Sequence, residues 1–534
     1  MPTSTTSKAG TADRTPEPET LHTIRLLLIG LAMSLLAAAW VRQPGYMDAD
    51  YYMLTARQLA RGEGFTEPVL WNYLDDPSQI PHPSHLYWLP LASLVAAGSM
   101  TLFGESFRAA QAPFVLIAAV LPLLAGRLAF QLTQDRELAT QAGWLAAFSG
   151  FFLPFNVTTD VFAAYAVLGA IAFWLMASAM EKRSARRWLA VGAVTGLGSL
   201  ARADGLLLLA IAVLAVILSK QNRARGFGAL LVGFVLVLGP WWLRNLSAVG
   251  SVANPGSLRL LWMLSYDDLF SYPAELLDFE RWRQAGLPTL LAARGSALLW
   301  NSARLVAENG LVFLGPFMLL GAIRLWSRRL VRLPIYYLGL LFGVMTIVFP
   351  FIGPRGAFFH SSTAAMPVLW ALAPVGLRGA IDWAGRKRNW DIGQARRVLG
   401  TAAMVLAAGL TIGLVALRLV IPAAAGQGWG AGLQTYSELG ERLSGSEGRV
   451  AVNNPPGFSL ATDREAVVIP NGPPETLHAV VRRYQVDWVV LESNHPSQLD
   501  PLYARPGSVP WLRLADQIAD PFGRPVYLLE VIQK

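Results

Sequence analysis

The sequence contains no cysteine and few charged residues for its length. None of the 534 residues is Cys, and Asp, Glu, Lys and Arg together make up 15%, whereas soluble domains carry about 25%. The lack of cysteine excludes disulfides, zinc–thiolate sites, iron–sulfur clusters and thiol nucleophiles. The shortage of charge, with 54% hydrophobic residues and a mean hydropathy of +0.40, excludes an ordinary soluble enzyme and a disordered chain. These features indicate a polytopic membrane protein.

The charge that is present is unbalanced, with a net charge of +9. In a membrane protein such an excess reflects Lys and Arg in cytoplasmic loops, so no nucleic-acid partner is expected. Residues 1–21 are polar and predict a disordered cytoplasmic tail. The apolar run 26–41 has a cleavage-like Ala stretch typical of a signal peptide. We interpret it as an uncleaved helix, because a long polar tail precedes it and a polytopic chain follows.

Eleven apolar runs predict membrane-spanning helices, because about twenty residues cross a bilayer. The runs are 26–41, 113–132, 139–155, 161–180, 188–200, 205–218, 227–246, 310–326, 334–351, 357–377 and 398–421. Four short basic loops separate some of them, at 182–187, 220–225, 324–332 and 378–397. The positive-inside rule places these loops in the cytoplasm. The N-terminus is then cytoplasmic and the C-terminus extracytoplasmic, in the plasma or inner membrane.

The segment 84–103 is also apolar, but charge parity leaves no room for it as a span. The first helix delivers the chain outside, and the basic loop 127–136 must be inside, so only one crossing fits between residues 84 and 132. We therefore predict a juxtamembrane helix at 84–103, lying at the outer leaflet. The alternative is that both runs cross and one loop breaks the rule. External loops are expected at about 43–110 and 247–309.

The composition changes near residue 426, where long apolar runs end. Short β-like runs occur at 449–452, 466–469, 488–491 and 526–531, and 475–484 has a helical pattern. We predict three parts: a tail 1–21, a transmembrane domain 22–425 and a small extracytoplasmic α/β domain 426–534. The last part contains neither a Gly-rich phosphate loop nor a nucleophile elbow.

The densest polar cluster, at 45–52, follows the first predicted span. It contains Asp48 and Asp50, and carboxylates at the mouth of a span are functional candidates because they are costly to leave unpaired. They suit a general base or oxygen ligands for Mg²⁺ or Mn²⁺. The alternative is that one of them only caps the helix predicted at 51–61.

Three further motifs follow this cluster in order. The predicted helix ends in Gly62-Glu63-Gly64-Phe65, and after an aromatic segment comes His82-Pro83-Ser84-His85-Leu86. The order resembles the polytopic GT-C glycosyltransferases that use polyprenyl-phosphate sugars, which include dolichyl-phosphate-mannose protein mannosyltransferases and lipid A aminoarabinose transferases. In that family the last motif reads Lys/His-Pro-Pro-Leu, so the chain departs from the pattern at Ser84 and His85.

The resemblance implies an α-helical GT-C fold and a hexosyl- or pentosyltransferase. Such an enzyme moves a sugar from a membrane-embedded polyprenyl phosphate to an acceptor on a protein, lipid or wall polymer, with inversion. Asp48 or Asp50 would be the general base, and Asp48 is favoured because the family's acid commonly opens its motif. Oligosaccharyl transferases of this superfamily use a metal and the mannosyl and aminoarabinosyl transferases do not, so a metal at Asp48 and Asp50 is left open.

The resemblance and the need for cations at a leaving phosphate select further candidates. His82 aligns best with the family's phosphate-contacting cation, and His85 is its competitor. The donor phosphate candidates are His82, His85, Arg57, Arg108, Arg202, Arg355 and His360, and the substrate-binding candidates are Tyr51, Asp204, Asp267 and Asp268.

Structural alternatives stand beside several of these candidates. Arg202 and Asp204 suit an ion pair across a loop, Arg355 a snorkelling side chain and His360 a buried structural histidine. For Asp160, helix capping is favoured over substrate contact.

Two other function classes compete with the transferase. A transporter or flippase would carry ionisable residues in mid-helix and an internal repeat, and the sequence shows neither. A non-catalytic scaffold would tolerate the loss of both Asp48 and Asp50.

Overall fold

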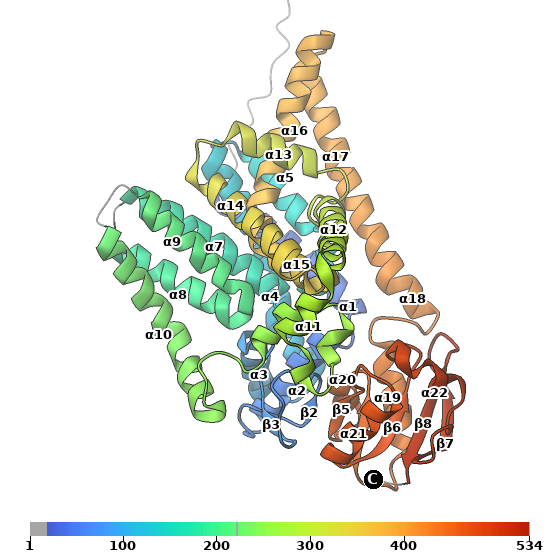
Figure 1. The fold of residues 1–534 in the computed structure, drawn as a ribbon. Helices are drawn as coiled ribbons and strands as arrows, with labels where there is room; N and C mark the ends of the chain where they lie inside the picture. The colour runs from blue at the N-terminus through green and yellow to red at the C-terminus, as the bar shows by residue number, and fades with distance from the viewer. Residues whose placement is uncertain (1–18, 183, 220–222, 533–534) are drawn as a thin grey trace, which may run out of the picture.

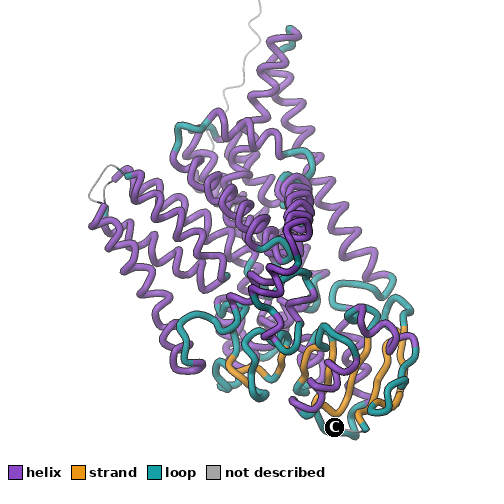
Figure 2. The backbone as a smooth tube through the Cα atoms, viewed as in Figure 1, coloured by secondary structure: helices purple, strands orange, loops and turns teal. Residues whose placement is uncertain are grey.

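The structure is a computed structural model that describes residues 19–182, 184–219 and 223–532. Long helices form a bundle, and a sheet with short helices lies at one end, at the bottom in Figure 1. Within the described residues, strands lie only at that end (Figure 2). Residues 1–18 of the predicted tail, and residues 183 and 220–222 of two predicted basic loops, lie outside the described residues.

The long helices of the bundle alternate with short ones in chain order. The first ten are α1 (Glu19–Trp40), α2 (Met47–Ala60), α3 (Leu91–Phe103), α4 (Phe107–Thr133), α5 (Arg136–Ala147), α6 (Phe152–Asn156), α7 (Phe162–Lys182), α8 (Ala185–Ala201), α9 (Leu206–Leu218) and α10 (Arg223–Val249). The next eight are α11 (Phe279–Gln284), α12 (Gly286–Arg304), α13 (Gly315–Arg324), α14 (Arg329–Gly343), α15 (Phe358–Ser362), α16 (Met366–Arg388), α17 (Ile392–Val415) and α18 (Ile421–Ala424).

Seven stretches of the described residues are helical, long and apolar enough to cross a membrane. They are Thr20–Trp40, Phe107–Thr133, Phe162–Lys182, Arg223–Val249, Arg329–Val348, Gly353–Arg388 and Ile392–Ala424. Each coincides with one of the eleven predicted spans. The chain is therefore a multi-pass membrane protein of mainly helical structure.

The other four predicted spans coincide with shorter helices, namely α5, α8, α9 and α13. Local backbone breaks explain two of them. Gly150 takes φ +61° just after α5, and Leu311 and Val312 take positive φ just before α13, which an α-helix does not allow. The predicted juxtamembrane segment contains α3, a separate helix of 13 residues. The sequence did not reveal α12, whose 19 residues lie inside the predicted external loop 247–309.

Glycines let some helices approach backbone to backbone, as in other membrane bundles. A Cβ on Gly192 of α8 would lie 2.0 Å from the carbonyl oxygen of Leu230 on α10, and a Cβ on Gly233 of α10 would lie 2.0 Å from the carbonyl oxygen of Leu189. No other residue fits at these crossings. The exposed faces of the same helices are apolar, for example at Leu236, which is 66% exposed.

The C-terminal part provides five strands of a six-stranded sheet, whose order is β2-β5-β4-β6-β8-β7 and whose edge strand β2 (Val69–Leu70) comes from the first loop. Its elements are α19 (Ala431–Arg442), β4 (Arg449–Val452), α20 (Pro455–Thr462), β5 (Ala466–Val468), α21 (Pro474–Tyr484), β6 (Val486–Leu491), α22 (Asp500–Ala504), β7 (Leu512–Ala519) and β8 (Pro525–Val531). The four predicted strands and the predicted helix are all present. The sequence did not reveal β7, because its side chains alternate poorly between buried and exposed.

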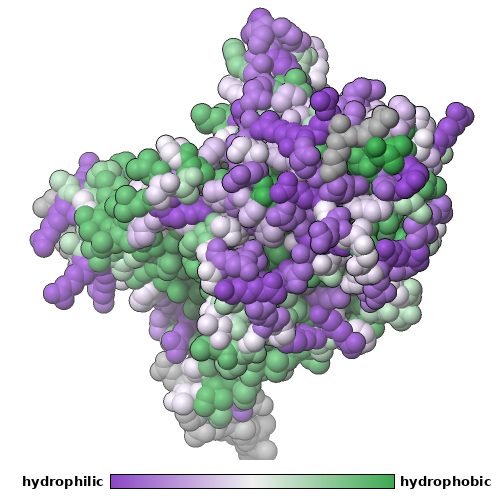
Figure 3. All heavy atoms as spheres, turned by 90° about the horizontal axis from the view of Figure 1, so that it is seen from below, coloured by the Kyte–Doolittle hydropathy of each residue, from purple (hydrophilic) through white to green (hydrophobic). Residues whose placement is uncertain are grey.

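The edge strand β2 (Val69–Leu70) comes from the loop after α2, far from the rest of the sheet in sequence. It pairs parallel to β5, with Val69 opposite Ala466. The same loop contains β1 (Thr66–Glu67) and β3 (His82–Pro83), which pair with each other. The first loop and the C-terminal sheet are therefore joined by strand pairing. Seen from this end (Figure 3), hydrophilic residues gather over the centre and hydrophobic residues over the flank where α8–α10 lie.

Candidate active site

A cavity of about 1270 Å³ lies where the bundle meets the sheet. Its walls come from the start of α2, the first loop, the α8–α9 junction, α15 and the segment 427–432 that leads into α19. Aromatic side chains line much of it, and the rings of Trp71 and Trp88 stack with their centroids 3.8 Å apart. A cavity of this size with apolar walls and a few polar groups suits a small-molecule or lipid headgroup ligand.

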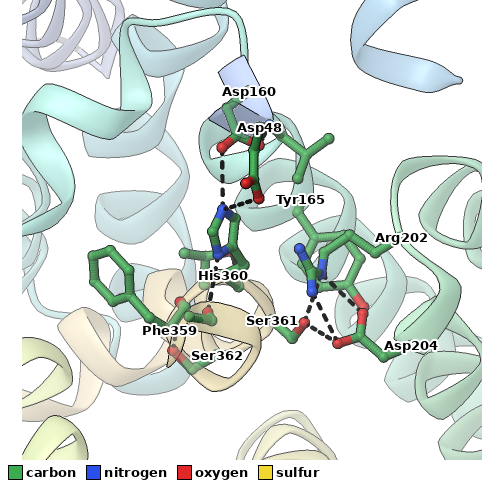
Figure 4. Close-up of polar contacts among 12 residues, drawn as sticks. Asp48, Asp160, Tyr165, Arg202, Asp204, Phe359, His360, Ser361 and Ser362 are labelled. Atoms are coloured by element: carbon green, nitrogen blue, oxygen red, sulfur yellow. Dashed lines mark hydrogen bonds and ion pairs between the residues drawn. The ribbon is translucent and has the colours of Figure 1, made fainter. Parts of the chain in front are cut away.

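Two carboxylates and an imidazole meet on one side of the cavity (Figure 4). His360 Nε2 lies 3.1 Å from Oδ2 of Asp160 and 3.8 Å from Oδ2 of Asp48. Asp48 comes from the first turn of α2, Asp160 from the turn before α7 and His360 from α15. Asp48 and His360 line the cavity, whereas Asp160 is only 1% exposed.

Hydrogen bonds fix the orientation of the His360 ring. Nδ1 lies 2.9 Å from the carbonyl oxygen of Gly356, which can only accept, so Nδ1 carries a hydrogen. Nε2 therefore faces the carboxylates of Asp160 and Asp48. Asp160 also accepts a hydrogen bond from the Tyr46 hydroxyl at 2.5 Å and one from the backbone N–H of Val161 at 2.6 Å.

Burial and these neighbours give Asp48 and Asp160 different pKa values. Burial raises the pKa of Asp48 to about 6, although His360 acts to lower it. Burial also acts to raise the pKa of Asp160, but His360 and the Tyr46 hydrogen bond outweigh it and hold that pKa below its usual value. Two nearby carboxyls with separated pKa values are typical of an acid–base site. Asp48 is thus the acid of this pair that is suited to accept a proton near neutral pH.

Asp50, the second predicted catalytic acid, turns away from the cavity. It is 2% exposed, and its Oδ2 accepts a hydrogen bond from Asn454 Nδ2 at 2.8 Å. Burial raises the pKa of Asp50 to about 7. Because α2 begins at Met47, Asp48 and Asp50 lie on different sides of one helical turn. The predicted pairing of Asp48 with Asp50 at one site is not observed.

Arg202 lines the cavity, with its charge balanced by a neighbour. Its Nε donates to Asp204 at 2.9 Å and to the Ser361 hydroxyl at 2.7 Å. Ser361 in turn donates to Asp204, and Tyr337 donates to the Ser361 carbonyl at 2.8 Å. The predicted ion pair across a loop is therefore present, and it also holds the guanidinium at the cavity wall (Figure 4).

His82 lines the cavity within an acidic group. Nε2 lies 3.0 Å from Glu67, and Nδ1, which is 3.9 Å from Asp75, has no hydrogen-bond partner within the described part of the chain. Burial acts to lower the pKa of His82, but Glu67 and Asp75 outweigh it and raise that pKa. Tyr51, a predicted substrate contact, lines the cavity and donates to Glu67. The neighbouring carboxylates thus favour the protonated form of His82 and would balance its charge.

The competitor His85 does not reach the cavity. It is fully buried, with Nδ1 2.8 Å from the Ser84 hydroxyl and Nε2 2.9 Å from the Ser93 hydroxyl. Burial lowers the pKa of His85 to about 3. A neutral imidazole with both nitrogens hydrogen-bonded is not a phosphate ligand, so the structure favours His82 over His85.

Arg355 is the predicted phosphate candidate most open to the cavity. Its guanidinium lies 4.8 Å from the centroid of the Tyr266 ring, and it has no carboxylate partner among the described residues. Arg418, which the sequence did not single out, also lines the cavity and lies 4.7 Å from the Phe155 ring centroid. Arg304 lines it too, paired with Glu308 at 2.5 Å.

These cations sit in or beside turns of π-helix. Arg355 lies in Gly353–Ala357 (η7), Arg418 in Ala416–Val420 (η9), and Glu308 in Leu305–Asn309 (η5), directly after Arg304. Such turns are rare and occur often at functional sites. Sequence reasoning missed Arg304, Glu308 and Arg418 because a π-turn leaves no clear periodicity, and because they lie within runs that read as apolar helix or external loop.

Four other predicted residues lie away from the cavity, which corrects their expected roles. Arg57 donates to the Ser459 carbonyl at 3.2 Å and pairs with Asp463 at 2.8 Å. Arg108 donates to backbone carbonyls near the end of α1, such as Ala38 at 2.7 Å. Asp268 pairs with Arg281 at 2.9 Å, and Asp267 is exposed outside the cavity lining. The partners named here are at least 13 positions away in the sequence, so the sequence could not reveal these contacts.

The donor set of Asp48, Asp160 and His360 fits a divalent metal ion. One ligand atom from each lies within 4.8 Å of the others, which is close enough for a single ion with bonds of about 2.0–2.3 Å. A metal held by Asp48 together with Asp50, which the sequence leaves open, does not fit, because Asp50 faces Asn454. The geometry thus replaces Asp50 by Asp160 and His360 as metal-ligating candidates.

Comparisons with known proteins place the chain in a fold class. A family model described as dolichyl-phosphate-mannose-protein mannosyltransferase matches residues 81–243. No curated protein matches the sequence. The solved structure of ArnT from Cupriavidus metallidurans in the apo state is similar, with a TM-score of 0.60 and 11% identity, over 96% of this chain and 98% of that chain.

Two further solved structures are similar over most of the chain. ArnT from Cupriavidus metallidurans bound to undecaprenyl phosphate gives a TM-score of 0.57 and 12% identity, over 97% of this chain and 99% of that chain. The archaeal oligosaccharyltransferase AglB from Archaeoglobus fulgidus, in complex with an inhibitory peptide and a dolichol-phosphate, gives 0.54 and 13%, over 88% and 69%. At these identities the similarity shows the fold, and it confirms the GT-C fold that the sequence motifs implied.

Proposed function

We propose, from the GT-C fold and the cavity, that the chain is a membrane glycosyltransferase. It transfers a sugar from a polyprenyl phosphate to a hydroxyl or amine of an acceptor, with inversion at the anomeric carbon. The observation that carries the proposal is Asp48, a carboxylate with a raised pKa at the wall of a large cavity that also contains cations. The similar structures of ArnT and AglB hold undecaprenyl phosphate and dolichol-phosphate, respectively.

In the proposed reaction Asp48 acts as the general base. It accepts the proton of the acceptor O–H or N–H as that atom attacks the anomeric carbon, and the bond between this carbon and the phosphate oxygen breaks. Polyprenyl phosphate leaves with the bonding electrons and the sugar is inverted. A base with a pKa near 6 is deprotonated at neutral pH and still basic enough to take a proton. His360 and Asp160 hold the position and charge of Asp48.

The leaving phosphate needs cations that are not already neutralised. Arg355 meets this need, because it is exposed at the cavity, contacts the Tyr266 ring and has no carboxylate partner among the described residues. Arg202 and His82 are each paired with carboxylates, so they contribute little net positive charge to the cavity. Trp71 and Trp88 offer stacked aromatic rings for the sugar or the first isoprene units.

A divalent cation held by Asp48, Asp160 and His360 would act as a Lewis acid on a phosphate or acceptor oxygen. An extracytoplasmic site is part of the proposal. It is supported by the position of the sheet, which lies at the end of the molecule opposite the predicted cytoplasmic loops 324–332 and 378–397 (Figure 1). The N-terminus is then cytoplasmic and the domain 426–534 extracytoplasmic. The sugar is proposed to be a hexose or pentose.

The test is transfer of label from polyprenyl-phosphate sugars by the purified full chain in lipid vesicles. Radiolabelled donors are offered in turn, with a cell-envelope extract as the acceptor source. We expect label to leave the lipid fraction with the wild type and not with Asp48→Asn, while the exposed-carboxylate variant Asp267→Asn behaves as the wild type. Equal turnover by Asp48→Asn and the wild type contradicts the proposal. Movement of intact donor between leaflets, without transfer, favours the flippase alternative.

A further inference from the structure

The first turn of α2, which carries Asp48, is held from outside by the C-terminal part of the chain. The residue before the helix, Tyr46, makes no side-chain capping hydrogen bond. Instead, Trp429 donates from Nε1 to the Pro44 carbonyl at 2.9 Å, and its ring meets that of Tyr46 edge to face. The position of this turn therefore depends on contacts beyond the helix itself.

Asp50 supplies the most direct of these contacts. Its Oδ2 accepts a hydrogen bond from Asn454 Nδ2 at 2.8 Å. The Asn454 Oδ1 accepts from the Gly457 N–H at 3.1 Å, so the amide orientation is set by its two partners. Asn454 is thus both the N-cap of α20 and the donor to α2.

The side chains around this hydrogen bond are closely packed. A Cβ on Gly457 would lie 2.5 Å from Asn454 Nδ2 and 2.9 Å from Asp50 Oδ2. Farther along α2, Arg57 donates to the carbonyls of Ser459 and Leu460 at the other end of α20. The helix α2 is therefore hydrogen-bonded to both ends of α20, although the two helices are far apart in the sequence.

Asn454 lies at the end of the sheet where α/β proteins usually bind ligands. It follows β4 at the carboxyl end of the parallel strands β2, β5, β4 and β6. In α/β sheets this edge carries the loops that bind ligands. Here α2 of the same chain takes that place, with Asp50 facing the sheet and Asp48 facing the cavity.

We propose that Asp50 is a positioning residue, whose hydrogen bond to Asn454 lets the C-terminal sheet set the position of Asp48 in the cavity. The proposal rests on the proposed transferase function. It also assigns the two acids of the motif different tasks: Asp48 touches the reacting atoms, and Asp50 anchors their helix. The buried Asp50 does not line the cavity, so it cannot take the acceptor proton itself.

The test exchanges the two groups. Asp50→Asn still offers an amide oxygen to Asn454, so its kcat should stay near that of the wild type. Asn454→Asp sets two carboxylates against each other, and kcat should fall about tenfold or more, since small misplacements of a catalytic group are costly. The double variant Asp50→Asn/Asn454→Asp restores the pair in reverse and should restore kcat. The KM for the donor should change little throughout.

The matched control is Asp76→Asn. Asp76 also joins the first loop to the C-terminal part, through an ion pair with Arg483 at 2.8 Å, but it does not touch α2 or line the cavity. We expect this variant to keep the wild-type kcat. Thermal unfolding of every variant in the same detergent shows whether it is folded.

A second pair of variants provides the test if Asn454→Asp does not fold. In a double-mutant cycle of Asp50→Ala and Asn454→Ala, the kcat losses should overlap, so that the double variant loses no more than the worse single variant. Losses that simply add, or a swap that fails to restore kcat, overturn the positioning role. An Asp50→Asn variant as inactive as Asp48→Asn also overturns it. Absence of transfer by the wild type instead overturns the proposed function.

Discussion

His360 Nε2 lies 3.1 Å from Asp160 Oδ2, although the two residues are 200 positions apart in the sequence. The contact joins the turn before α7 to the short helix α15. The same nitrogen lies 3.8 Å from Asp48 Oδ2 (Figure 4). Because Nδ1 of the same ring donates to Gly356, only Nε2 is left to serve the carboxylates. The pKa of Asp48 thus depends on Asp160 and His360, which are both far from Asp48 in the sequence.

Replacing Asp48 tests the base directly. Asp48→Asn keeps the size of the side chain but cannot accept the proton, so transfer should fall about 100-fold to 10,000-fold, the usual contribution of a general base. Donor binding, measured by quenching of the cavity tryptophans, should persist. The wild-type rate should rise with pH through about 6, the raised pKa of Asp48, and then level off. A rate that is independent of pH between 5 and 7 contradicts the role.

The neighbours of Asp48 should move this pH profile in opposite directions. His360 acts to lower the pKa of Asp48 and Asp160 acts to raise it. His360→Gln should therefore shift the acid limb of the rate profile to higher pH, and Asp160→Asn should shift it to lower pH. The measurement is the rate from pH 4.5 to 8.5 with saturating donor. A limb that stays in place in both variants shows that the two residues do not tune Asp48.

Much of the fold could be predicted from hydropathy, because the seven long helices are continuous apolar runs. The strands of the C-terminal part could be predicted from short β-branched runs. The helix α12 could not, because polar residues such as Thr289, Arg294 and Ser296 interrupt its apolar runs. The strand β2 has only two residues, and its partner β5 lies almost 400 positions away, so no local pattern marks it.

The candidate site could be predicted only where a motif carried it. Local motifs predict Asp48, His82 and His360 as site residues, and all three line the cavity. Asp160 was expected to cap a helix, and it does bind the N–H of Val161. Its second oxygen meets Tyr46 and His360, and this depends on tertiary packing. Spacing does not distinguish Asp50 from Asp48, since their roles are separated by the start of α2 at Met47 and by their distant partners, His360 for Asp48 and Asn454 for Asp50.

Metal binding can be measured apart from activity. We expect Mn²⁺ to bind the purified protein at Asp48, Asp160 and His360, detected by electron paramagnetic resonance. Asp160→Asn should weaken binding by about tenfold or more, whereas Asp50→Asn should leave it unchanged. Affinity should rise with pH, because the ligands must lose their protons. Equal binding by the wild type and Asp160→Asn contradicts this ligand set. Transfer that survives EDTA would show that the base acts without a metal.

Arg355 should govern donor affinity. Its guanidinium is held over Tyr266 without a carboxylate partner among the described residues, so Arg355→Gln removes a net positive charge from the cavity. The KM for the donor should rise about tenfold to 100-fold, as expected for losing a charge-assisted hydrogen bond. The acid limb of the rate profile should stay near pH 6. As a control, Arg281→Gln alters an arginine whose partner Asp268 lies outside the cavity. An unchanged KM in Arg355→Gln would place the phosphate elsewhere.

Asp50 should make the protein less stable as the pH rises. Its pKa is raised by burial to about 7 in the folded protein, above the value of about 3.9 in an unfolded chain. The folded state therefore holds more protons between these two pH values, and the free energy of unfolding falls as the pH rises through this window. Asn does not titrate, so Asp50→Asn should be more stable than the wild type at pH 8, by about 1–3 kcal/mol.

The measurement is the thermal unfolding midpoint in detergent at pH 4.5 and pH 8. The advantage of Asp50→Asn should shrink at the lower pH, where the wild-type carboxyl is protonated. Asp267→Asn, which removes an exposed carboxylate, corrects for the change in net charge. If Asp50→Asn gains nothing at pH 8, the carboxylate is stabilised in the folded protein by Asn454 alone, and burial does not set its pKa.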